Sequence, residues 1–422
     1  MSDICIVGCG FVGLTVAAAL SKKKHRVVCV DRNASRVALL RSGRVPFYEP
    51  SLTKHLADAH ELIRYEGVIP QWMDAYVVCV GTPLGVDGRL DCSAVLAAVK
   101  EVATAARKPL IVVKSTLQPG TCREMLAMLR LGVNADATLL FWPETLREGS
   151  ALADFEAQPC VVGESEEEAD DRVDVWFSQV LGIHIDRLVS YESAELFKLA
   201  LNGYLAMRVS YINEIAGACL ETGADIRDVQ ALMSTDQRVG GGLCAGPGWS
   251  GSCWPKDVPA LCSAAKFQRH DCVAWNIEPS NRARVRRILN VICSTANQSK
   301  ICRVAIWGCA FKENTSDLRG SPAIDAIGWL VGDGATVSVY DPHAIDGVRA
   351  MFGDKINYGA DEIDACVGAD LLVVLNDFFG GRIRDRLPEA AAVMKPEPTL
   401  VDLRNLVTRE EAERIGFTYI QV

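Results

Sequence analysis

Residues 4–13 read ICIVGCGFVG, an apolar run followed by the spacing G-x-G-x-x-G. The run predicts a short buried strand, and the glycines Gly8, Gly10 and Gly13 predict a tight turn that opens a helix. The first glycine permits the turn, the second lets the backbone approach a pyrophosphate, and the third lets the helix pack closely on the strand. The N-terminus of that helix would supply donors for the phosphate. This stretch therefore predicts a dinucleotide-binding domain.

The acidic residue that completes the motif is Asp31, which follows the next predicted strand. Its carboxylate would accept hydrogen bonds from the ribose hydroxyls and repel a 2′-phosphate, so it favours NAD over NADP. Arg32 beside it tempers that preference. A turn of this kind that binds no cofactor is the alternative interpretation.

Strands and helices continue to alternate beyond the motif. Short runs rich in Val, Ile and Cys, flanked by Gly, Pro and Asp, are typical of buried parallel strands. In the first third these runs are Ile4–Val7, Val27–Val30, Tyr76–Val80, Leu110–Lys114 and Thr138–Trp142, and helical stretches such as Val12–Ser21 and Ser93–Ala106 lie between them. In the last third the runs are Arg303–Trp307, Thr336–Tyr340, Leu371–Leu375 and Thr399–Leu403. We therefore predict an α/β fold with two Rossmann-like, doubly wound parallel-sheet domains.

The middle of the chain is predicted to be helical. Ser193–Glu221 is compatible with one long helix and is apolar nearly all round, so we expect it to be buried between domains or between subunits. A second helix, a glycine-rich loop at Gly240–Gly251 and a further helical segment follow, and the polar stretch 294–300 suggests a boundary. The predicted domains are 1–190 for cofactor binding, 191–296 for the central helical region and 297–422 for the last α/β domain.

Composition excludes several classes of protein. The chain has 422 residues, 49% of them hydrophobic, and a net charge of −9 from 44 basic and 53 acidic residues. An acidic total argues against a nucleic-acid-binding protein, whose phosphate contacts need a basic face. The sequence shows neither a secretory signal nor an uncharged apolar run long enough to cross a membrane. We therefore expect a cytoplasmic protein without a membrane partner.

One of the sixteen cysteines stands out. The cysteines are scattered without a C-x-x-C pair, and there are six histidines, so the sequence predicts no metal site. Most of the cysteines are expected to be small buried residues in a reducing compartment. Cys253 lies in a glycine-rich loop with Lys256 three residues on, and a nearby cation would raise the thiolate fraction of its thiol. A buried structural thiol is the alternative.

Other polar residues occur where α/β proteins bind ligands. Glu144 and Glu148 follow the strand Thr138–Trp142, and one of these carboxylates could act as a general base. A solvated loop acid is the alternative. Lys198 and Asn202 share one face of the long helix, where a buried lysine is costly unless it is paired or functional. Its alternative is a lysine that reaches the surface.

Two cations follow the strand Arg303–Trp307 at a junction between strand and helix. Lys312 and Arg319 suggest a phosphate site there, and a surface ion-pair cluster is the alternative.

Taken together, these motifs resemble the UDP-glucose/GDP-mannose dehydrogenase family over nearly the whole chain. The matching positions are Gly8–Gly13, Ser42-Gly43, Pro46, Tyr48-Glu49-Pro50, Gly81-Thr82-Pro83, Lys114-Ser115-Thr116, Pro119-Gly120-Thr121, Pro143-Glu144, Leu146–Gly149, Lys198, Asn202, Asn213-Glu214, Gly251-Ser252-Cys253, Pro255-Lys256-Asp257, Ala310-Phe311-Lys312, Asp317, Arg319, Ser321-Pro322, Asp402 and Arg404-Asn405. The resemblance implies an NAD domain, a central helical dimerisation domain that makes a homodimer, and a nucleotide-sugar domain. It also implies oxidation of the C6 alcohol of a nucleotide sugar to a carboxylate, with two hydride transfers to NAD.

The resemblance also implies a role for each matching residue. Cys253 would capture the intermediate aldehyde as a thiohemiacetal, whose oxidation gives a thioester, and Glu144 would be the base for its hydrolysis. Lys198 and Asn202 would hold the developing oxyanion, and Asp257 with Thr116 would order the water. The implied cofactor site consists of Gly8, Gly10, Phe11, Val12, Gly13, Asp31, Arg36, Thr82, Thr116, Glu148 and Arg319. The implied substrate site consists of Glu144, Leu146, Lys198, Asn202, Arg238, Gly251, Lys312 and Arg404.

Several departures from the family pattern concern the substrate. Trp142 stands where the family usually has Asn, and Thr145 where it has Phe. The loop between Arg238 and Cys253 is one residue shorter than usual, with Ser250 for a Gly and Gly242 for an aromatic residue. UDP-glucose is the leading substrate. GDP-mannose, which the segment Gln158-Pro159-Cys160 favours slightly, and another UDP-hexose, including a UDP-N-acetylhexosamine, are the alternatives.

Two other classes of function stay open at this point. A hydroxyacid dehydrogenase with the same N-terminal fold would not need Cys253 and would make one NADH per substrate. A sensor would bind the nucleotide sugar without turnover, although Cys253, Lys198 and Glu144 argue against it.

Overall fold

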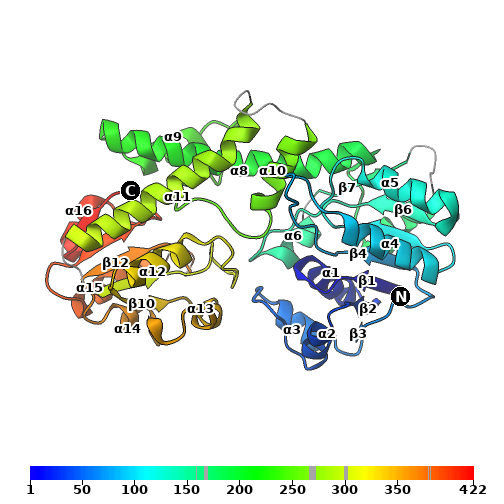
Figure 1. Ribbon diagram of the computed structural model, residues 1–422, viewed down its shortest axis with the longest axis horizontal. Helices are drawn as coiled ribbons and strands as arrows, with labels where there is room; N and C mark the ends of the chain where they lie inside the picture. The colour runs from blue at the N-terminus through cyan, green and yellow to red at the C-terminus, as the bar shows by residue number, and fades with distance from the viewer. Residues whose placement is uncertain (158, 166–169, 266–271, 299–302, 379, 381) are drawn as a thin grey trace. The chain divides into compact units, whose positions relative to one another are not determined.

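The computed structural model describes residues 1–157, 159–165, 170–265, 272–298, 303–378, 380 and 382–422 (Figure 1). The chain forms two compact units. The first consists of Met1–Asn202 with Pro259–Phe267, and the second of Gly203–Val258 with Gln268–Val422. The predicted division at 190/191 and 296/297 is finer and stays a prediction. Two sequence features, residue 158 of the segment Gln158-Pro159-Cys160 and the end of the stretch 294–300, lie outside the described residues.

The first unit is built on a sheet in the order β3-β2-β1-β4-β5-β6-β7-β8. Its strands are β1 Asp3–Val7, β2 Arg26–Val30, β3 Ile63–Glu66, β4 Ala75–Val78, β5 Leu110–Val113, β6 Thr138–Phe141, β7 Val161–Glu164 and β8 Arg187–Ser190. Neighbouring strands pair in parallel except β6 and β7, which meet antiparallel at Phe141 and Gly163. Strands such as β4 and β5 are buried at every position, which explains their unbroken apolar sequence.

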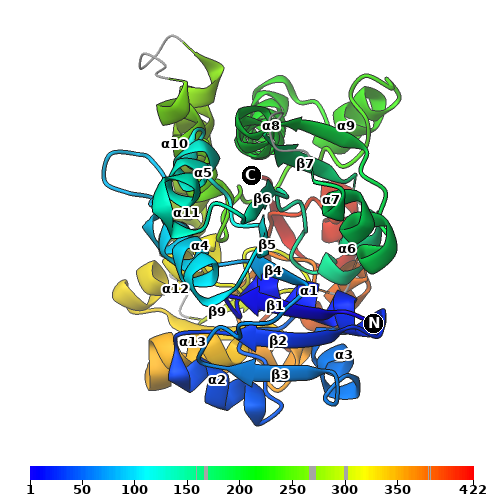
Figure 2. The same cartoon turned by 90° about the vertical axis from the view of Figure 1, so that its right-hand side faces the viewer.

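Helices cover both faces of this sheet (Figure 2). Buried side chains of α1, α3 and α6 pack on one face, and those of α4 and α5 pack on the other. The helices are α1 Phe11–Lys22, α2 Ala34–Arg41, α3 Leu52–Asp58, α4 Ser93–Ala105, α5 Thr121–Met128, α6 Ala151–Ala157 and α7 Arg172–Val175, with π-helical turns at Leu129–Val133 and Trp176–Leu181. The unit is therefore doubly wound, as predicted.

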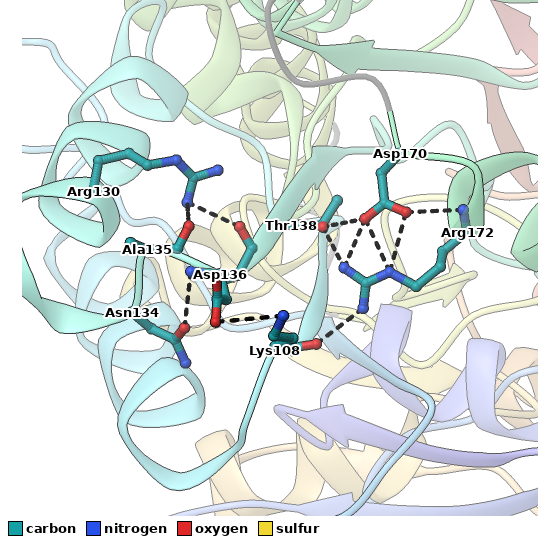
Figure 3. Close-up of polar contacts among 9 residues, drawn as sticks. Lys108, Arg130, Asn134, Ala135, Asp136, Thr138, Asp170 and Arg172 are labelled. Atoms are coloured by element: carbon teal, nitrogen blue, oxygen red, sulfur yellow. Dashed lines mark hydrogen bonds and ion pairs between the residues drawn. The ribbon is translucent and has the colours of Figure 1, made fainter.

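The N-terminal end of β6 is fixed by a polar network (Figure 3). Arg172 donates to the Asp170 carboxylate, at 2.6 Å from Nη2, and to Thr138 Oγ1, also at 2.6 Å. Its Nη1 donates to the Lys108 carbonyl at 2.9 Å. Hydrogen bonds from Arg172 and Thr138 lower the pKa of Asp170 to about 2, against the effect of burial. The network joins the segments before β5 and β6 to the start of α7.

The second unit is built on a parallel sheet in the order β11-β10-β9-β12-β13-β14. Its strands are β9 Arg303–Trp307, β10 Thr336–Tyr340, β11 Asn357–Tyr358, β12 Leu371–Val374, β13 Thr399–Asp402 and β14 Thr418–Ile420. The helices α11 Val273–Gln298, α12 Pro322–Gly332 and α13 Ile345–Phe352 pack on one face. The helices α14 Glu362–Cys366, α15 Leu387–Val393 and α16 Arg409–Ile415 pack on the other, and 3₁₀ turns occur at Gly353–Lys355 and Ile383–Arg386. The second predicted Rossmann-like domain is thus confirmed.

The central helices are α8 Tyr191–Thr222, α9 Ile226–Ser234 and α10 Trp254–Ala264. Leu199 and Ile212 of α8 are buried, but Phe197, Tyr204 and Tyr211 are 37%, 49% and 50% exposed. The chain's own residues therefore cover only part of the apolar surface of this helix, and its burial between domains or between subunits stays a prediction. No helix among the described residues is long and apolar enough to span a membrane.

Candidate active site

The glycine-rich turn between β1 and α1 has the geometry that its sequence predicts. Gly8 has a φ of 104°, and a Cβ at Gly13 would lie 1.9 Å from the Gly8 carbonyl oxygen, so a side chain is excluded at both positions. A Cβ at Gly10, by contrast, would meet no atom within 4 Å. Gly10 is also the N-cap of α1, which receives no hydrogen bond from a capping side chain. The open space and the uncapped N–H groups fit a dinucleotide pyrophosphate.

Asp31 is held beside this turn, directly after β2. Its carboxylate accepts hydrogen bonds from the backbone N–H groups of Cys9 at 3.0 Å and Asn33 at 2.8 Å, and from Arg36 Nη1 at 2.9 Å. Burial alone would raise the pKa of Asp31, but these hydrogen bonds lower it. The predicted cofactor residues Asp31 and Arg36 thus form an ion pair, and the carboxylate is held ionised next to the phosphate turn.

Three further predicted residues follow neighbouring parallel strands. Thr82 lies after β4, Thr116 after β5 and Glu144 after β6, and all three are buried. Because the carboxyl ends of parallel strands lie at one edge of a sheet, the structure brings them to the same edge as Gly8–Gly13. Lys198 and Asn202, one turn apart on α8, are buried as well.

The loop after β6 is tied down by a buried glutamate. Glu49, 2% exposed, accepts hydrogen bonds from the backbone N–H groups of Gly149 at 2.7 Å and Ala151 at 2.8 Å. Glu144 Oε1 accepts a hydrogen bond from the backbone N–H of Leu146, whereas its Oε2 is buried without a partner in the described structure. A buried carboxylate oxygen without a partner is costly unless a ligand or water satisfies it. The predicted residues Leu146 and Glu148 belong to this fixed loop.

Lys114, the residue between β5 and the pair Ser115-Thr116, was not among the predicted site residues. Its side chain is buried, and its ammonium lies 3.5 Å from the centroid of the Trp142 ring. The sequence signal that could have revealed it is a lysine directly after an all-apolar strand, next to a threonine of the site.

In the second unit, Cys253 directly precedes α10. Its carbonyl accepts the backbone N–H groups of Lys256 at 3.2 Å and Asp257 at 3.0 Å, so the thiol lies at the N-terminus of a helix. The thiol is exposed, and the Ser252 hydroxyl lies 3.5 Å from its sulfur. A helix N-terminus favours the thiolate.

Lys256, the cation that the sequence places near Cys253, pairs with a neighbouring carboxylate, and its effect on the thiol stays a prediction. Its ammonium lies 2.5 Å from Oδ1 of the fully buried Asp257, which balances its charge. The helix N-terminus, which sequence reasoning missed, is a further source of positive potential beside the thiol.

The loop that carries Cys253 packs against the segment after β9. Gly251 donates its backbone N–H to the Arg319 carbonyl at 2.9 Å. A Cβ at Gly251 would lie 2.8 Å from the Phe311 ring, which explains the glycine at this predicted substrate position. The family-like segments around Gly251 and Phe311 are thus in contact.

The predicted substrate cations of the second unit differ in setting. Arg404, after β13, is half-buried and donates from Nε to the Leu375 carbonyl at 3.0 Å and from Nη2 to Asn376 Oδ1 at 3.2 Å. Burial lowers the pKa of Arg404. A Cβ at Gly246 would lie 3.3 Å from Arg404 Nη1, so this guanidinium adjoins the glycine-rich loop.

The remaining predicted cations lie near the surface. Arg238 pairs with Asp236 at 2.6 Å and Arg319 with Asp317 at 2.7 Å, both with largely exposed side chains. Lys312 Nζ lies 5.6 Å from the centroid of the Phe311 ring. The structure thus contains the ion pair that was the alternative interpretation of Arg319, and the roles of these cations stay predictions.

The described residues contain no group of three or more His, Cys, Asp and Glu arranged to hold a metal ion. The proposed catalytic residues divide between the units: Thr116, Glu144, Lys198 and Asn202 belong to the first, and Cys253 and Asp257 to the second.

Comparison with known proteins identifies the family. Residues 2–181 match the NAD binding domain of the UDP-glucose/GDP-mannose dehydrogenase family, residues 192–279 its central domain and residues 305–409 its UDP binding domain. A UDP-glucose 6-dehydrogenase of Pseudomonas aeruginosa is 35% identical over 99% of this chain and 96% of its own length. One of Rhizobium meliloti is 33% identical over 99% of both.

A solved structure agrees over the same length. The UDP-glucose dehydrogenase of Pyrobaculum islandicum superposes with a TM-score of 0.81 at 28% identity, covering 99% of this chain and 98% of that one. Three consecutive family domains, relatives matched end to end and a glycine turn shaped for a dinucleotide lead to one conclusion. The chain belongs to the UDP-glucose/GDP-mannose dehydrogenase family and is an NAD-dependent nucleotide-sugar 6-dehydrogenase.

Proposed function

We propose that the chain oxidises the C6 alcohol of UDP-glucose to the carboxylate of UDP-glucuronate, with Cys253 as the covalent nucleophile. The observation that carries this proposal is the position of the Cys253 thiol, exposed at the N-terminus of α10. A simple alcohol dehydrogenase has no use for such a thiol, whereas oxidation to an acid must retain the aldehyde. The names of the relatives support UDP-glucose as the substrate.

Gly8–Gly13 and Asp31 would hold NAD, which would supply the hydride acceptor in both oxidations, one NAD for each. In the first, the alcohol also loses its proton to the water that Thr116 and Asp257 order. Lys198 and Asn202 stabilise negative charge on the C6 oxygen, because a buried ammonium and amide are effective oxyanion donors.

The second oxidation proceeds on the enzyme. The Cys253 thiolate adds to the aldehyde carbon, and the resulting thiohemiacetal oxyanion, stabilised by Lys198 and Asn202, becomes a thioester by loss of a hydride alone. Glu144 takes a proton from water, and the hydroxide attacks the thioester carbon. The carbon–sulfur bond then breaks, which releases the carboxylate and restores the thiolate. The unpartnered Oε2 of Glu144 suits this role, since it has an acceptor position to offer.

The test is the stoichiometry of the purified enzyme. We expect two NADH per UDP-glucuronate, and no acid from Cys253→Ser, while the matched variant Cys272→Ser in the same unit keeps the wild-type yield. Acid production by Cys253→Ser would refute the covalent step. One NADH per substrate would indicate the hydroxyacid alternative, and tight binding without NADH would indicate a sensor.

The same assay identifies the hexose and the nucleotide base of the preferred substrate. UDP-glucose, GDP-mannose, UDP-N-acetylglucosamine and UDP-N-acetylmannosamine are compared by kcat/KM, with the mass of each product. We expect UDP-glucose to be preferred, and a higher kcat/KM for GDP-mannose or an N-acetylated sugar would transfer the proposal to that substrate.

We further propose a homodimer formed through α8, in the cytoplasm. Phe197, Tyr204 and Tyr211 lie seven residues apart on this helix and leave an exposed apolar stripe in the single chain. The mass in solution should be that of a dimer, and Tyr204→Glu should shift it toward the monomer. No disulfide joins any of the described cysteines, which suits a reducing compartment.

A further inference from the structure

The proposed mechanism requires Thr116 to order a water molecule, and this residue lies on a short loop between β5 and α5. The loop begins at a fixed point, because the Ser115 hydroxyl donates to the Val80 carbonyl at 2.7 Å. It ends at Gly120, the N-cap of α5, which has a left-handed φ of 96° and no side chain to cap the helix. The backbone N–H groups of the first turn of α5 therefore need an acceptor from another part of the chain.

Glu195 of α8 provides this acceptor. Its carboxylate accepts the backbone N–H of Gly120 at 2.7 Å on one oxygen and that of Cys122 at 2.7 Å on the other. Glu195 is fully buried, and a buried carboxylate is costly unless hydrogen bonds and a positive potential compensate it. The N-terminus of α5 supplies both. Glu195 therefore ties the end of the Thr116 loop to a helix much further along the chain.

α8 itself is fixed within the first unit by contacts that do not involve Glu195. The Tyr191 hydroxyl donates to the Leu139 carbonyl of β6 at 2.6 Å. Ala194 packs tightly on β7, where a Cβ at Gly163 would lie 2.9 Å from the Ala194 Cβ. Loss of the Glu195 carboxylate would therefore release the loop, whereas the helix would keep its place.

We propose that Glu195 is a positioning residue, which holds the loop of Thr116 in a fixed position relative to the catalytic face of α8. The inference rests on the proposed function, since it concerns the placement of the water in that reaction. Lys198 and Asn202 lie three and seven residues after Glu195, so they share its face of the helix, and both are buried. The oxyanion donors and the anchor of the Thr116 loop thus belong to one rigid element. This arrangement matters for catalysis, because a displacement of a catalytic group by about 1 Å can slow a reaction about 100-fold.

The test measures kcat, KM and Tm of Glu195→Gln with the nucleotide sugar that the wild-type enzyme oxidises. Glutamine has nearly the same shape, but its amide nitrogen cannot accept the N–H group that the second carboxylate oxygen accepts. We expect kcat to fall about tenfold because Thr116 is displaced, and KM for the nucleotide sugar to change less than about twofold because Lys198 and Asn202 stay in place. If Glu195→Gln does not fold, Glu195→Asp replaces it, because its shorter carboxylate cannot reach both N–H groups.

The matched control is Glu192→Gln on the same helix. Glu192 also connects α8 with α5, through an ion pair with Arg123 at 2.8 Å, but both side chains are 46% exposed. Such a pair contributes little to stability, and it lies outside the Thr116 loop. Glu192→Gln should therefore keep the wild-type kcat.

A double-mutant cycle separates positioning from stability. In a Thr116→Ala background the hydroxyl that Glu195 positions is gone, so Glu195→Gln should lower kcat further by less than about twofold, while its effect on Tm should be the same in both backgrounds. A kcat of Glu195→Gln within about twofold of the wild type, or the same loss of kcat in the Thr116→Ala background, overturns the inference. Wild-type enzyme that makes no uronate from any nucleotide sugar would instead overturn the proposed function itself, so the two failures are distinguishable.

Discussion

Two glycines of the dinucleotide turn should respond in opposite ways to the same added methyl group. A Cβ at Gly13 would lie 1.9 Å from the Gly8 carbonyl oxygen, while a Cβ at Gly10 would meet nothing within 4 Å. The first position is closed by the protein itself, and the second is open in the protein alone. Gly13→Ala should therefore damage the fold, and Gly10→Ala should damage only cofactor binding.

The distances set the size of each effect. Ordinary carbon–oxygen contact is reached at about 3.4 Å, so the methyl group at Gly13 overlaps a backbone atom by about 1.5 Å. Relieving such an overlap costs about 1–3 kcal/mol, which lowers Tm by several degrees. Gly10 has a φ of −85° and a ψ of −165°, which alanine tolerates. An alanine at position 10 caps the helix less well than glycine, but it also loses less conformational entropy on folding. The two effects on the free energy of unfolding offset one another to within about 1 kcal/mol.

The assay measures both quantities on each variant. Thermal unfolding gives Tm without ligand, and a titration followed by calorimetry gives Kd for NAD. We expect Gly10→Ala to unfold within about 2 °C of the wild type and to bind NAD at least about tenfold more weakly. Gly13→Ala should lose several degrees in Tm. Equal destabilisation by both variants, or wild-type affinity for NAD in Gly10→Ala, would refute the assignment of Gly10 to the pyrophosphate.

Two further predictions concern other parts of the chain. Arg404→Lys should weaken the binding of UDP about tenfold with unchanged affinity for NAD, because a lysine cannot reproduce the forked contacts of this half-buried guanidinium. Calorimetry with each ligand tests this, and equal UDP affinity would contradict it. The Asp170 network stabilises the fold above the ordinary pKa of 3.8 and loses that effect as the pH falls toward about 2, because the folded-state pKa is depressed. Denaturant unfolding should therefore show Asp170→Asn to be less stable than the wild type at pH 7, with a smaller difference at pH 3, and a difference that grows on acidification would contradict the ion pair.

The parts of the fold that could be predicted from the sequence are those buried on both faces. β9 and β10 match their predicted limits, and β1, β2, β4, β5, β6, β12 and β13 match within one or two residues. β3, β7, β8, β11 and β14 were missed, and of these β3, β8, β11 and β14 lie at the edges of their sheets. β3 is an edge strand with alternating exposure, and two of the four residues of β8 are exposed, so neither shows an unbroken apolar run. β7 pairs antiparallel with β6, a change of direction that strand composition does not encode.

For the candidate site, residues that belong to short sequence motifs could be predicted, whereas contacts that depend on the folded structure could not. The glycine turn, Asp31 and the residues after β4, β5 and β6 were predictable, because each lies within a short motif. The cation–π contact of Lys114 was not, because Trp142 is twenty-eight residues away and its ring is oriented by Trp176 and Phe177. The pairing of Lys256 with Asp257 was missed for another reason: the two are adjacent, and only the helix geometry shows that they pair with each other.

The turn after β9 in the second unit resembles the dinucleotide turn after β1, but it lacks the G-x-G-x-x-G spacing. Gly308 donates its backbone N–H to the Tyr340 carbonyl at 2.9 Å, and Cys309 donates to Asp341 at 2.8 Å, just as Gly8 donates to Val30 and Cys9 to Asp31 in the first unit. The two turns are therefore built alike up to the second glycine.

At the position of the second glycine, the second unit has Ala310, which is buried and donates its own backbone N–H to Asp341 at 3.0 Å. The backbone N–H groups of residues 343 and 344 donate to the other oxygen of Asp341, which therefore accepts four backbone hydrogen bonds in all. The buried alanine in place of the open glycine and the four backbone donors on Asp341 distinguish this turn from the first one, in agreement with the match of the two units to an NAD binding and a UDP binding domain.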